Sequence, residues 1–234
     1  MRERPILFNG AMVRAILAGL KTQTRRAAKL PHQNPLGRWE ASTSGGHGAR
    51  DRKGNLVPEH ACIWHTRTGE AFSCPLGEPG DRLWVRETWM DLTGTGIEHR
   101  DMATGKRTRY AYGADSAKGS ASDEARKDFG LKWRPSVHMP REACRLVLEI
   151  TAVRVEQLQA ISKEDALAEG LHRYAHNWRD SEYPLPDVAY EAWQGAENRY
   201  SCPRHAFRDL WLSTGGDWDG NPWVWVIEFK QVTA

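Results

Sequence analysis

The segment RLVLEITAVRVEQL, residues 145–158, carries the strongest strand signal in the chain. Apolar side chains alternate with other residues at positions 146, 148 and 150, and the alternation resumes at Val153 and Val155 with a shift of one residue. A period of two predicts a long β-strand with one side facing a core. The shift predicts a β-bulge or a sharp bend near Thr151 and Ala152.

Shorter strand and helix patterns lie on both sides of this segment. Strands are predicted at PILF (5–8), TQTRR (22–26), LWVRETW (83–89), RYAYGA (109–114) and NPWVWVIEFKQV (221–232). Helices are predicted at 9–20 with Asn9 as N-cap, at 162–169 with Ser162 and Asp165 in capping-box spacing, and within 186–213. Short strands among loops with a few helices predict an α+β, mainly β, fold: a small β-barrel with flanking helices.

Two polar tracts interrupt this pattern, at about residues 30–78 and 91–130. The first is rich in Gly, Ser and Pro and has no sustained period, which is typical of irregular segments. We therefore expect one domain over residues 1–234 that carries two long polar insertions, the first of them partly mobile.

Composition restricts the class of protein only loosely. Charged residues make up 27% of the chain, but the net charge is only +3, so an anionic partner is permitted and not required. No run reaches the ~20 apolar residues of a membrane span, and the N-terminus lacks the apolar stretch of a signal peptide. We expect a cytoplasmic protein whose four cysteines are reduced thiols.

The segment GLKTQTRR, residues 19–26, places a lysine and two threonines close together. If residues 22–26 are extended, Thr22 and Thr24 share one face of the strand, and Arg25 faces away from the site. A desolvated Lys21 amine could lose its proton and act as a base toward a neighbouring hydroxyl. The alternative is that Lys21 offsets the dipole of the helix before it.

Two glutamates occupy positions that local stability does not explain. Glu169 falls in the last turn of the helix predicted at 162–169, where a carboxylate opposes the helix dipole. Glu87 lies between Val85 and Trp89 on the face of the strand that carries apolar residues, where burial without a partner is costly. Each is expected either to form a salt bridge or to have a functional role.

Two further segments could bind ligands. WRPSVHMPREACR, residues 133–145, interleaves basic and aromatic residues in a proline-containing loop, which suits contact with a nucleobase or a phosphate. HACIWHTRTGEAFSC contains four residue types that bind zinc, at His60, Cys62, His65 and Cys74. Because it has no CxxC or HxxxH pair, we do not predict a metal site there.

The segment ILFNGAMVRAILAGLKTQTRR, residues 6–26, resembles the opening motif of the ASCH domain family, a branch of the PUA-like β-barrels. The family signature is a helix followed by G-x-K-x-x-T-x-R, and Gly19, Lys21, Thr24 and Arg26 occupy its positions. Further similarity lies in PGDRLWVRETW, WRPSVHMPR, ITAVRVEQLQAISKEDALAEG and NPWVWVIEF. In this combination the chain resembles the long ASCH proteins of bacteriophages and prophages.

This resemblance implies an enzyme. One branch of the family removes the acyl group from the exocyclic amine of N4-acylated cytosine nucleosides such as N4-acetylcytidine, with a lysine, a threonine and a glutamate. Those residues fall on Lys21, Thr24 and Glu169, and the resemblance implies no cofactor. Side chains that would contact the base and ribose are Arg26, Glu87, Met139 and Arg141, with Trp89 as a stacking surface.

Two other functions stay open. The chain could be an RNA-binding or RNA-cleaving ASCH module, with RNA as its partner, or a phage morphogenesis or host-interaction factor. For the amidohydrolase we expect a small nucleoside as the ligand, no membrane association and a monomer.

Overall fold

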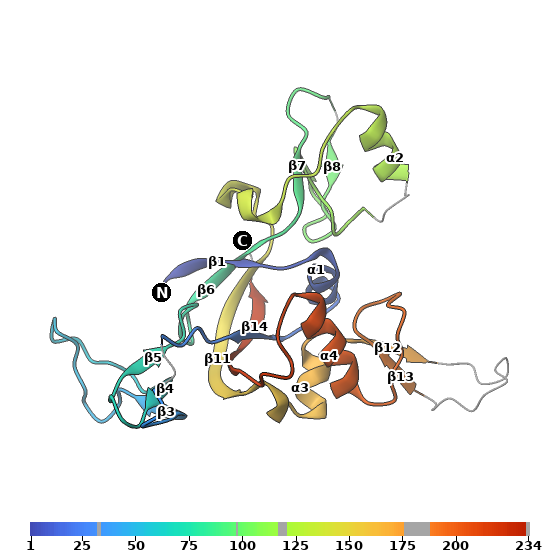
Figure 1. Ribbon diagram of the computed structural model, residues 1–234. Helices are drawn as coiled ribbons and strands as arrows, with labels where there is room; N and C mark the ends of the chain where they lie inside the picture. Colours follow the sequence, from blue (N-terminus) through green and yellow to red (C-terminus); the bar gives the residue numbers. More distant parts are fainter. Residues whose placement is uncertain (32–33, 97, 117–120, 176–187, 233–234) are drawn as a thin grey trace.

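The computed structural model describes residues 1–31, 34–96, 98–116, 121–175 and 188–232. Strands predominate, and the largest sheet has the order β1-β6-β11-β14-β2 (Figure 1). Its members are β1 (Glu3–Leu7), β6 (Arg82–Arg86), β11 (Val147–Gln157), β14 (Trp223–Val232) and β2 (Gln23–Ala27). The pair β1–β6 is parallel, and the other neighbours are antiparallel.

The segment that gave the strongest strand signal forms the middle of this sheet. β11 pairs with β14 along its whole length and with β6 over its first three residues. The register to β14 shifts between Ile150 and Ala152. The predicted strand and its irregularity near Thr151 are therefore confirmed.

The expected small β-barrel is not closed. Within the described part of the chain, no backbone pairing joins the edge strands β1 and β2. A side chain connects them instead, because Arg26 Nη2 donates a hydrogen bond to the Leu7 carbonyl at 2.7 Å. The prediction of a mixed, mainly β fold is confirmed, whereas the strands expected to form a small β-barrel make an open sheet in the described part of the chain.

Three helices cover the sheet: α1 (Gly10–Leu17), α3 (Lys163–Ala168) and α4 (Pro203–Ser213). Asn9 caps α1 by accepting from Met12 N, and Ser162 caps α3 by accepting from Asp165 N, as the sequence predicts. The buried residues of α4 pack on the side of β14 that carries Val224 and Val226. Residues of α1 pack on the opposite side, with Trp225 and Ile227.

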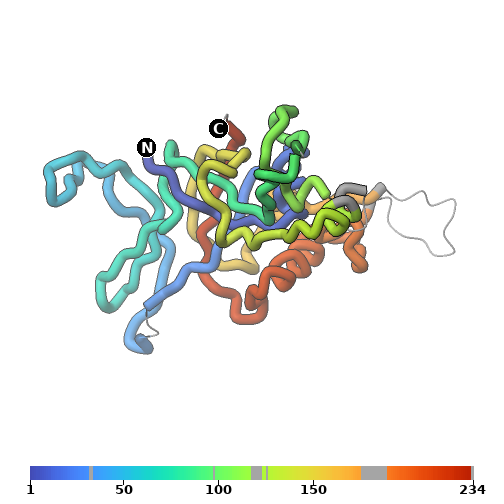
Figure 2. The backbone as a smooth tube through the Cα atoms, turned by 90° about the horizontal axis from the view of Figure 1, so that it is seen from above, coloured from blue at the N-terminus to red at the C-terminus, as the bar shows by residue number. Residues whose placement is uncertain are grey.

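The first insertion forms a sheet of three strands, β3 (Trp39–Ser44), β4 (His60–His65) and β5 (Ala71–Ser73). This sheet projects from one end of the molecule, away from α3 and α4 (Figures 1 and 2). The expectation of an irregular tract was wrong here. Trp39 contacts His65 and Phe72 with ring centroids 4.7 and 5.5 Å apart, and residues so far apart in sequence leave no periodic pattern.

The described part of the second insertion contains four short strands and one helix. These are β7 (Trp89–Asp91), β8 (His99–Arg100), β9 (Arg107–Thr108), β10 (Tyr110–Tyr112) and α2 (Ala121–Asp128). The remaining elements are β12 (His172–Ala175), β13 (Val188–Glu191) and three 3₁₀ turns at Ser136–His138, Arg141–Ala143 and Leu158–Ala160. Residues 188–191, within a region predicted as helical, are thus a strand, and the helix begins only at Pro203.

A buried arginine fixes the second insertion to the main sheet. Arg145 precedes β11 and makes five hydrogen bonds of 2.7–3.0 Å to Glu87, Asp101 and Asp115. All four side chains are at most 4% exposed. Burial raises the pKa of Glu87, and its ion pair with Arg145 only partly offsets this effect.

All four cysteines are free thiols, as predicted. None of the described helices has the length and apolar character needed to cross a membrane.

Candidate functional site

A cavity of about 350 Å³ lies where the main sheet is open, between β1 and β2. Its polar lining residues include Thr24, Arg25, Arg26 and Glu169. Its apolar lining comes from Phe8, Met12 and the α4 residues Phe207, Leu210 and Trp211. Thr88 and Ser136 contribute hydroxyl groups from the segments that precede β7 and β11. The cavity therefore combines a charged floor with an apolar wall.

Backbone contacts to α1 and to the residue after α3 position Lys21. Its amide donates to the Ala15 carbonyl in α1 at 3.1 Å, and the residue forms an isolated antiparallel bridge with Glu169. Gly170 makes this approach possible, since a Cβ there would lie 2.8 Å from Lys21 Cβ. Gly170 also has φ +89°, which glycine adopts most readily. The residue after α3 is thus brought against the start of β2.

The Lys21 amine is fully buried and has two acceptors on one residue. Lys21 Nζ lies 2.8 Å from Glu169 Oε2 and 2.8 Å from the Glu169 carbonyl oxygen. Burial lowers the pKa of Lys21, and the favourable interaction with Glu169 does not fully restore it. The positive charges of Arg26 and Arg25 lower this pKa further. A buried lysine with a lowered pKa can supply a neutral amine, which is the form that accepts a proton.

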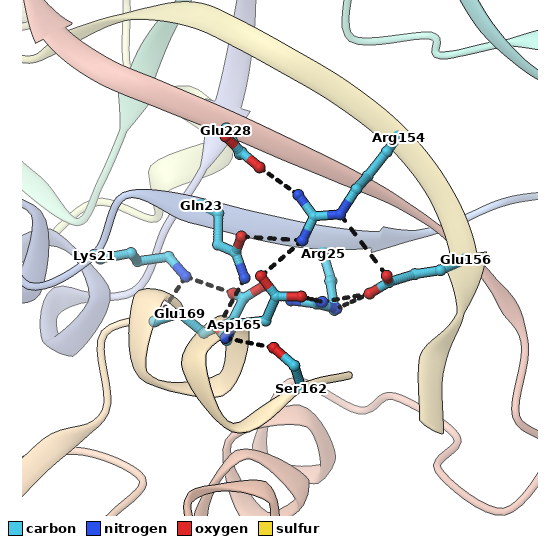
Figure 3. A network of polar contacts seen from close by, with 9 residues as sticks. All are labelled: Lys21, Gln23, Arg25, Arg154, Glu156, Ser162, Asp165, Glu169 and Glu228. Carbon is cyan, nitrogen blue, oxygen red and sulfur yellow. Dashed lines mark hydrogen bonds and ion pairs between the residues drawn. The ribbon is translucent and has the colours of Figure 1, made fainter. Parts of the chain in front are cut away.

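Arg25 binds the other oxygen of the same carboxylate (Figure 3). Its Nη1 donates to Glu169 Oε1 at 3.0 Å, so each oxygen of Glu169 has its own cation. The Arg25 side chain is 0% exposed and lies 5.7 Å from the Phe207 ring. The prediction that Arg25 faces away from the site is therefore wrong. It shares a strand face with Lys21 and Gln23, and that face packs against α3.

The network continues from Arg25 to β11 and α3. Arg25 also binds Glu156 through Nε at 3.0 Å and Asp165 through Nη2 at 3.1 Å. Arg154 binds Asp165 at 2.7 Å and contacts Glu228 (Figure 3). Charges of both signs alternate through this network, which connects strands β2, β11 and β14 to α3.

Thr24 and Arg26 belong to the cavity lining. Thr24 is only 3% exposed and lines the cavity, as Glu169 does. Arg26 lies over the Phe8 ring, 5.1 Å from its centroid, and its Nε has no hydrogen-bond partner in the described structure. Burial lowers the pKa of Arg26 despite the attraction of Glu169. Arg26 therefore carries one buried N–H donor that the described structure leaves without a partner.

The other side chains considered for substrate contact lie outside this lining. Glu87 pairs with Arg145, and Met139 Sδ accepts a hydrogen bond from Glu87 N at 3.3 Å. Trp89 packs against Tyr110 with ring centroids 5.8 Å apart, and the exposed Arg141 pairs with Glu3. Thr24, Arg26 and Glu169 line the cavity and Lys21 binds Glu169, whereas Glu87, Trp89, Met139 and Arg141 are not among the lining residues.

No group of three or more metal-binding side chains converges among the described residues. In the first insertion, His60 Nδ1 contacts the Pro58 carbonyl and Nε2 contacts Ser73 Oγ at 2.9 Å. Cys62, in the same strand as His60, is buried, and burial raises the pKa of its thiol.

Residues that the sequence did not point to complete the site. Arg25 binds Glu169, Glu156 and Asp165 bind Arg25, and α4 supplies the apolar wall. The alternation of Lys21, Gln23 and Arg25 could have placed Arg25 beside the lysine, if Lys21 had been taken as part of the strand.

Scans of this chain against protein-family models, curated proteins and solved structures found no match in any of the three comparisons.

Proposed function

We propose that the protein is an amidohydrolase of the ASCH type, with a PUA-like fold, that removes the acyl group from N4-acylated cytosine nucleosides such as N4-acetylcytidine. The observation that supports this most is the buried Lys21 amine, 2.8 Å from Oε2 of Glu169, a residue that lines the same cavity as Thr24. Lysine, glutamate and threonine are the groups that a base-assisted attack by a hydroxyl requires.

In the first step Lys21 acts as the base and Thr24 as the nucleophile. A neutral amine has two N–H groups, which match the two Glu169 acceptors, and its lone pair is left for the Thr24 hydroxyl proton. As this proton moves to Lys21, Thr24 Oγ1 forms a bond to the acyl carbonyl carbon. The C–N bond then breaks, the lysine ammonium returns the proton to the cytosine N4 amine, and an acyl ester of Thr24 remains.

In the second step water removes the acyl group. The cytosine nucleoside leaves, and Lys21, again neutral, takes a proton from a water molecule that attacks the ester carbonyl. The ester C–O bond breaks, Thr24 Oγ1 receives the proton from Lys21, and a carboxylic acid is released. Glu169 stays ionised throughout, orienting Lys21 and stabilising its ammonium form in each step.

The cavity suits a ligand of this kind in size and polarity. Its volume of about 350 Å³ lies within the range of small-molecule sites, ~300–1,000 Å³. Arg26 Nε, Thr88 and Ser136 offer polar contacts to a nucleoside, while the α4 wall offers apolar surface to the base or the acyl chain.

Acetate release from N4-acetylcytidine tests the proposal. We expect Lys21→Met, Thr24→Val and Glu169→Gln each to reduce kcat by about 10²-fold or more, whereas the exposed neighbours Lys29→Met, Thr22→Val and Glu164→Gln keep normal turnover. Undiminished turnover in all three site variants would refute the mechanism. Salt-dependent oligonucleotide binding without acetate release would favour the RNA-binding function.

A further inference from the structure

The Glu169 carboxylate is shared by two cations whose roles differ. Lys21 Nζ binds Oε2 at 2.8 Å, and Arg25 Nη1 binds Oε1 at 3.0 Å. Arg25 is always protonated, whereas Lys21 must alternate between its charged and neutral forms to act as a base. The permanent positive charge of Arg25, which binds Oε1, therefore competes with Lys21 for the negative charge of Glu169.

The Arg25 guanidinium also binds two carboxylates on the side that faces away from Glu169. Its Nε donates to Glu156 Oε1 at 3.0 Å and its Nη2 donates to Asp165 Oδ2 at 3.1 Å. Arg154 holds Asp165 through the other oxygen at 2.7 Å (Figure 3). These contacts come from β11 and α3, so two elements besides its own strand determine the position of the Arg25 guanidinium.

We propose that Arg25 is a positioning residue of this site: it fixes Glu169 so that only Oε2 is offered to Lys21, and its charge keeps that carboxylate from holding Lys21 permanently protonated. This inference rests on the proposed function for its catalytic consequence. The arrangement of Arg25, Glu169 and Lys21 carries it independently of which amide is cleaved.

The charges that face Lys21 determine the sign of the effect. They are Glu169, which favours the ammonium form, and Arg25 and Arg26, which disfavour it. Glu156 and Asp165 lie on the far side of Arg25, and Arg154 lies beyond Asp165. If Arg25 loses its charge, Glu169 attracts the lysine proton more strongly, so the pKa of Lys21 rises toward its ordinary value.

Two readouts test this, and one of them needs no substrate. The first is the titration midpoint of Lys21, followed by NMR of protein labelled at the lysine ε-carbon and assigned by the Lys21→Met variant. The second is the pH dependence of acetate release from N4-acetylcytidine. In Arg25→Gln we expect the Lys21 midpoint and the acidic limb of the rate profile to move to higher pH by about one unit.

Matched variants separate positioning from folding. Arg25→Lys keeps the charge but cannot hold Glu169, Glu156 and Asp165 together, so we expect a midpoint close to that of the unmodified protein with a lower kcat. Arg154→Gln also removes an arginine bound to Asp165 but does not contact Glu169, so we expect a smaller shift than in Arg25→Gln. Should Arg25→Gln fail to fold, Asp165→Asn provides a second perturbation, since it releases Arg25 from one side.

The outcomes are distinguishable. An unchanged Lys21 midpoint in folded Arg25→Gln, or a shift to lower pH, would overturn the inference. A midpoint that moves up as expected, in a protein that releases no acetate from any N4-acylcytidine, would support the role of Arg25 and refute the proposed function.

Discussion

Replacing Arg145 with methionine tests how the second insertion is attached. Arg145 is 3% exposed and uses all five of its N–H donors on three carboxylates. Methionine keeps much of the apolar length but leaves Glu87, Asp101 and Asp115 buried without their cation.

The loss in free energy of unfolding expected for Arg145→Met is large compared with the total stability of a domain. Removing one partner of a buried ion pair destabilises by about 3–5 kcal/mol, against a total of about 5–15 kcal/mol for a typical domain. We expect Arg145→Met to lie at the upper end of that cost, because three carboxylates lose their partner. Arg145→Lys keeps a charge but has only three donors, and we expect it to cost about half as much.

The pH dependence of this cost has a definite sign. Without Arg145 the folded-state pKa of Glu87 and of Asp115 rises, because burial then acts on each carboxyl group without the opposing cation. A raised carboxyl pKa penalises folding above that pKa, and protonation removes the penalty as pH falls. The deficit of the variant is therefore expected to be smaller at pH 5 than at pH 8.

Urea unfolding at both pH values, monitored by tryptophan fluorescence, measures this deficit. Arg100→Met, an exposed arginine of the same insertion, is the control and should change stability by no more than about 0.5 kcal/mol. If Arg145→Met lowers the free energy of unfolding no more than the control does, Arg145 does not hold the insertion in place. A loss of stability that grows as the pH falls would contradict the role of the three carboxylates.

Two further substitutions test the site itself. Gly170→Ala places a Cβ 2.8 Å from Lys21 Cβ at φ +89°, so we expect a loss of about 1–3 kcal/mol in thermal or urea unfolding; Gly19→Ala, at φ +71° with nothing within 4 Å, is the control without the contact and should cost less. Arg26→Gln removes a charged donor from the cavity lining and should lower kcat/KM for N4-acetylcytidine by about 10-fold or more in initial-rate assays. An equal cost for both glycine variants, or an unchanged kcat/KM for Arg26→Gln, would contradict the geometry.

The main sheet could be predicted from the sequence because its signals are local. β11 and β14 have long alternating patterns, and the caps at Asn9 and Ser162 follow from residue types at fixed spacing. The first insertion could not be predicted in this way. Its strands are held by aromatic contacts such as Trp39–Phe72, between residues far apart in the sequence.

The candidate site was predictable only in part for the same reason. The motif around Lys21 and Thr24 is contiguous, but its pairing with Glu169 spans 148 residues. Arg25 shares a strand face with Lys21 and Gln23, and this face could be linked to the site only if Lys21 had been taken as part of the strand. The apolar wall depends on how α4 packs on β14, which no short motif encodes.

The central claim, that Thr24 is acylated with the help of Lys21, can be tested by trapping the intermediate. The protein is mixed with N4-acetylcytidine, quenched rapidly in acid, digested and analysed by mass spectrometry. We expect one acetyl group on Thr24 that disappears on longer incubation and is absent from Lys21→Met. Acetate release at the normal rate by Thr24→Val, with no acetyl group ever found on Thr24, would contradict it.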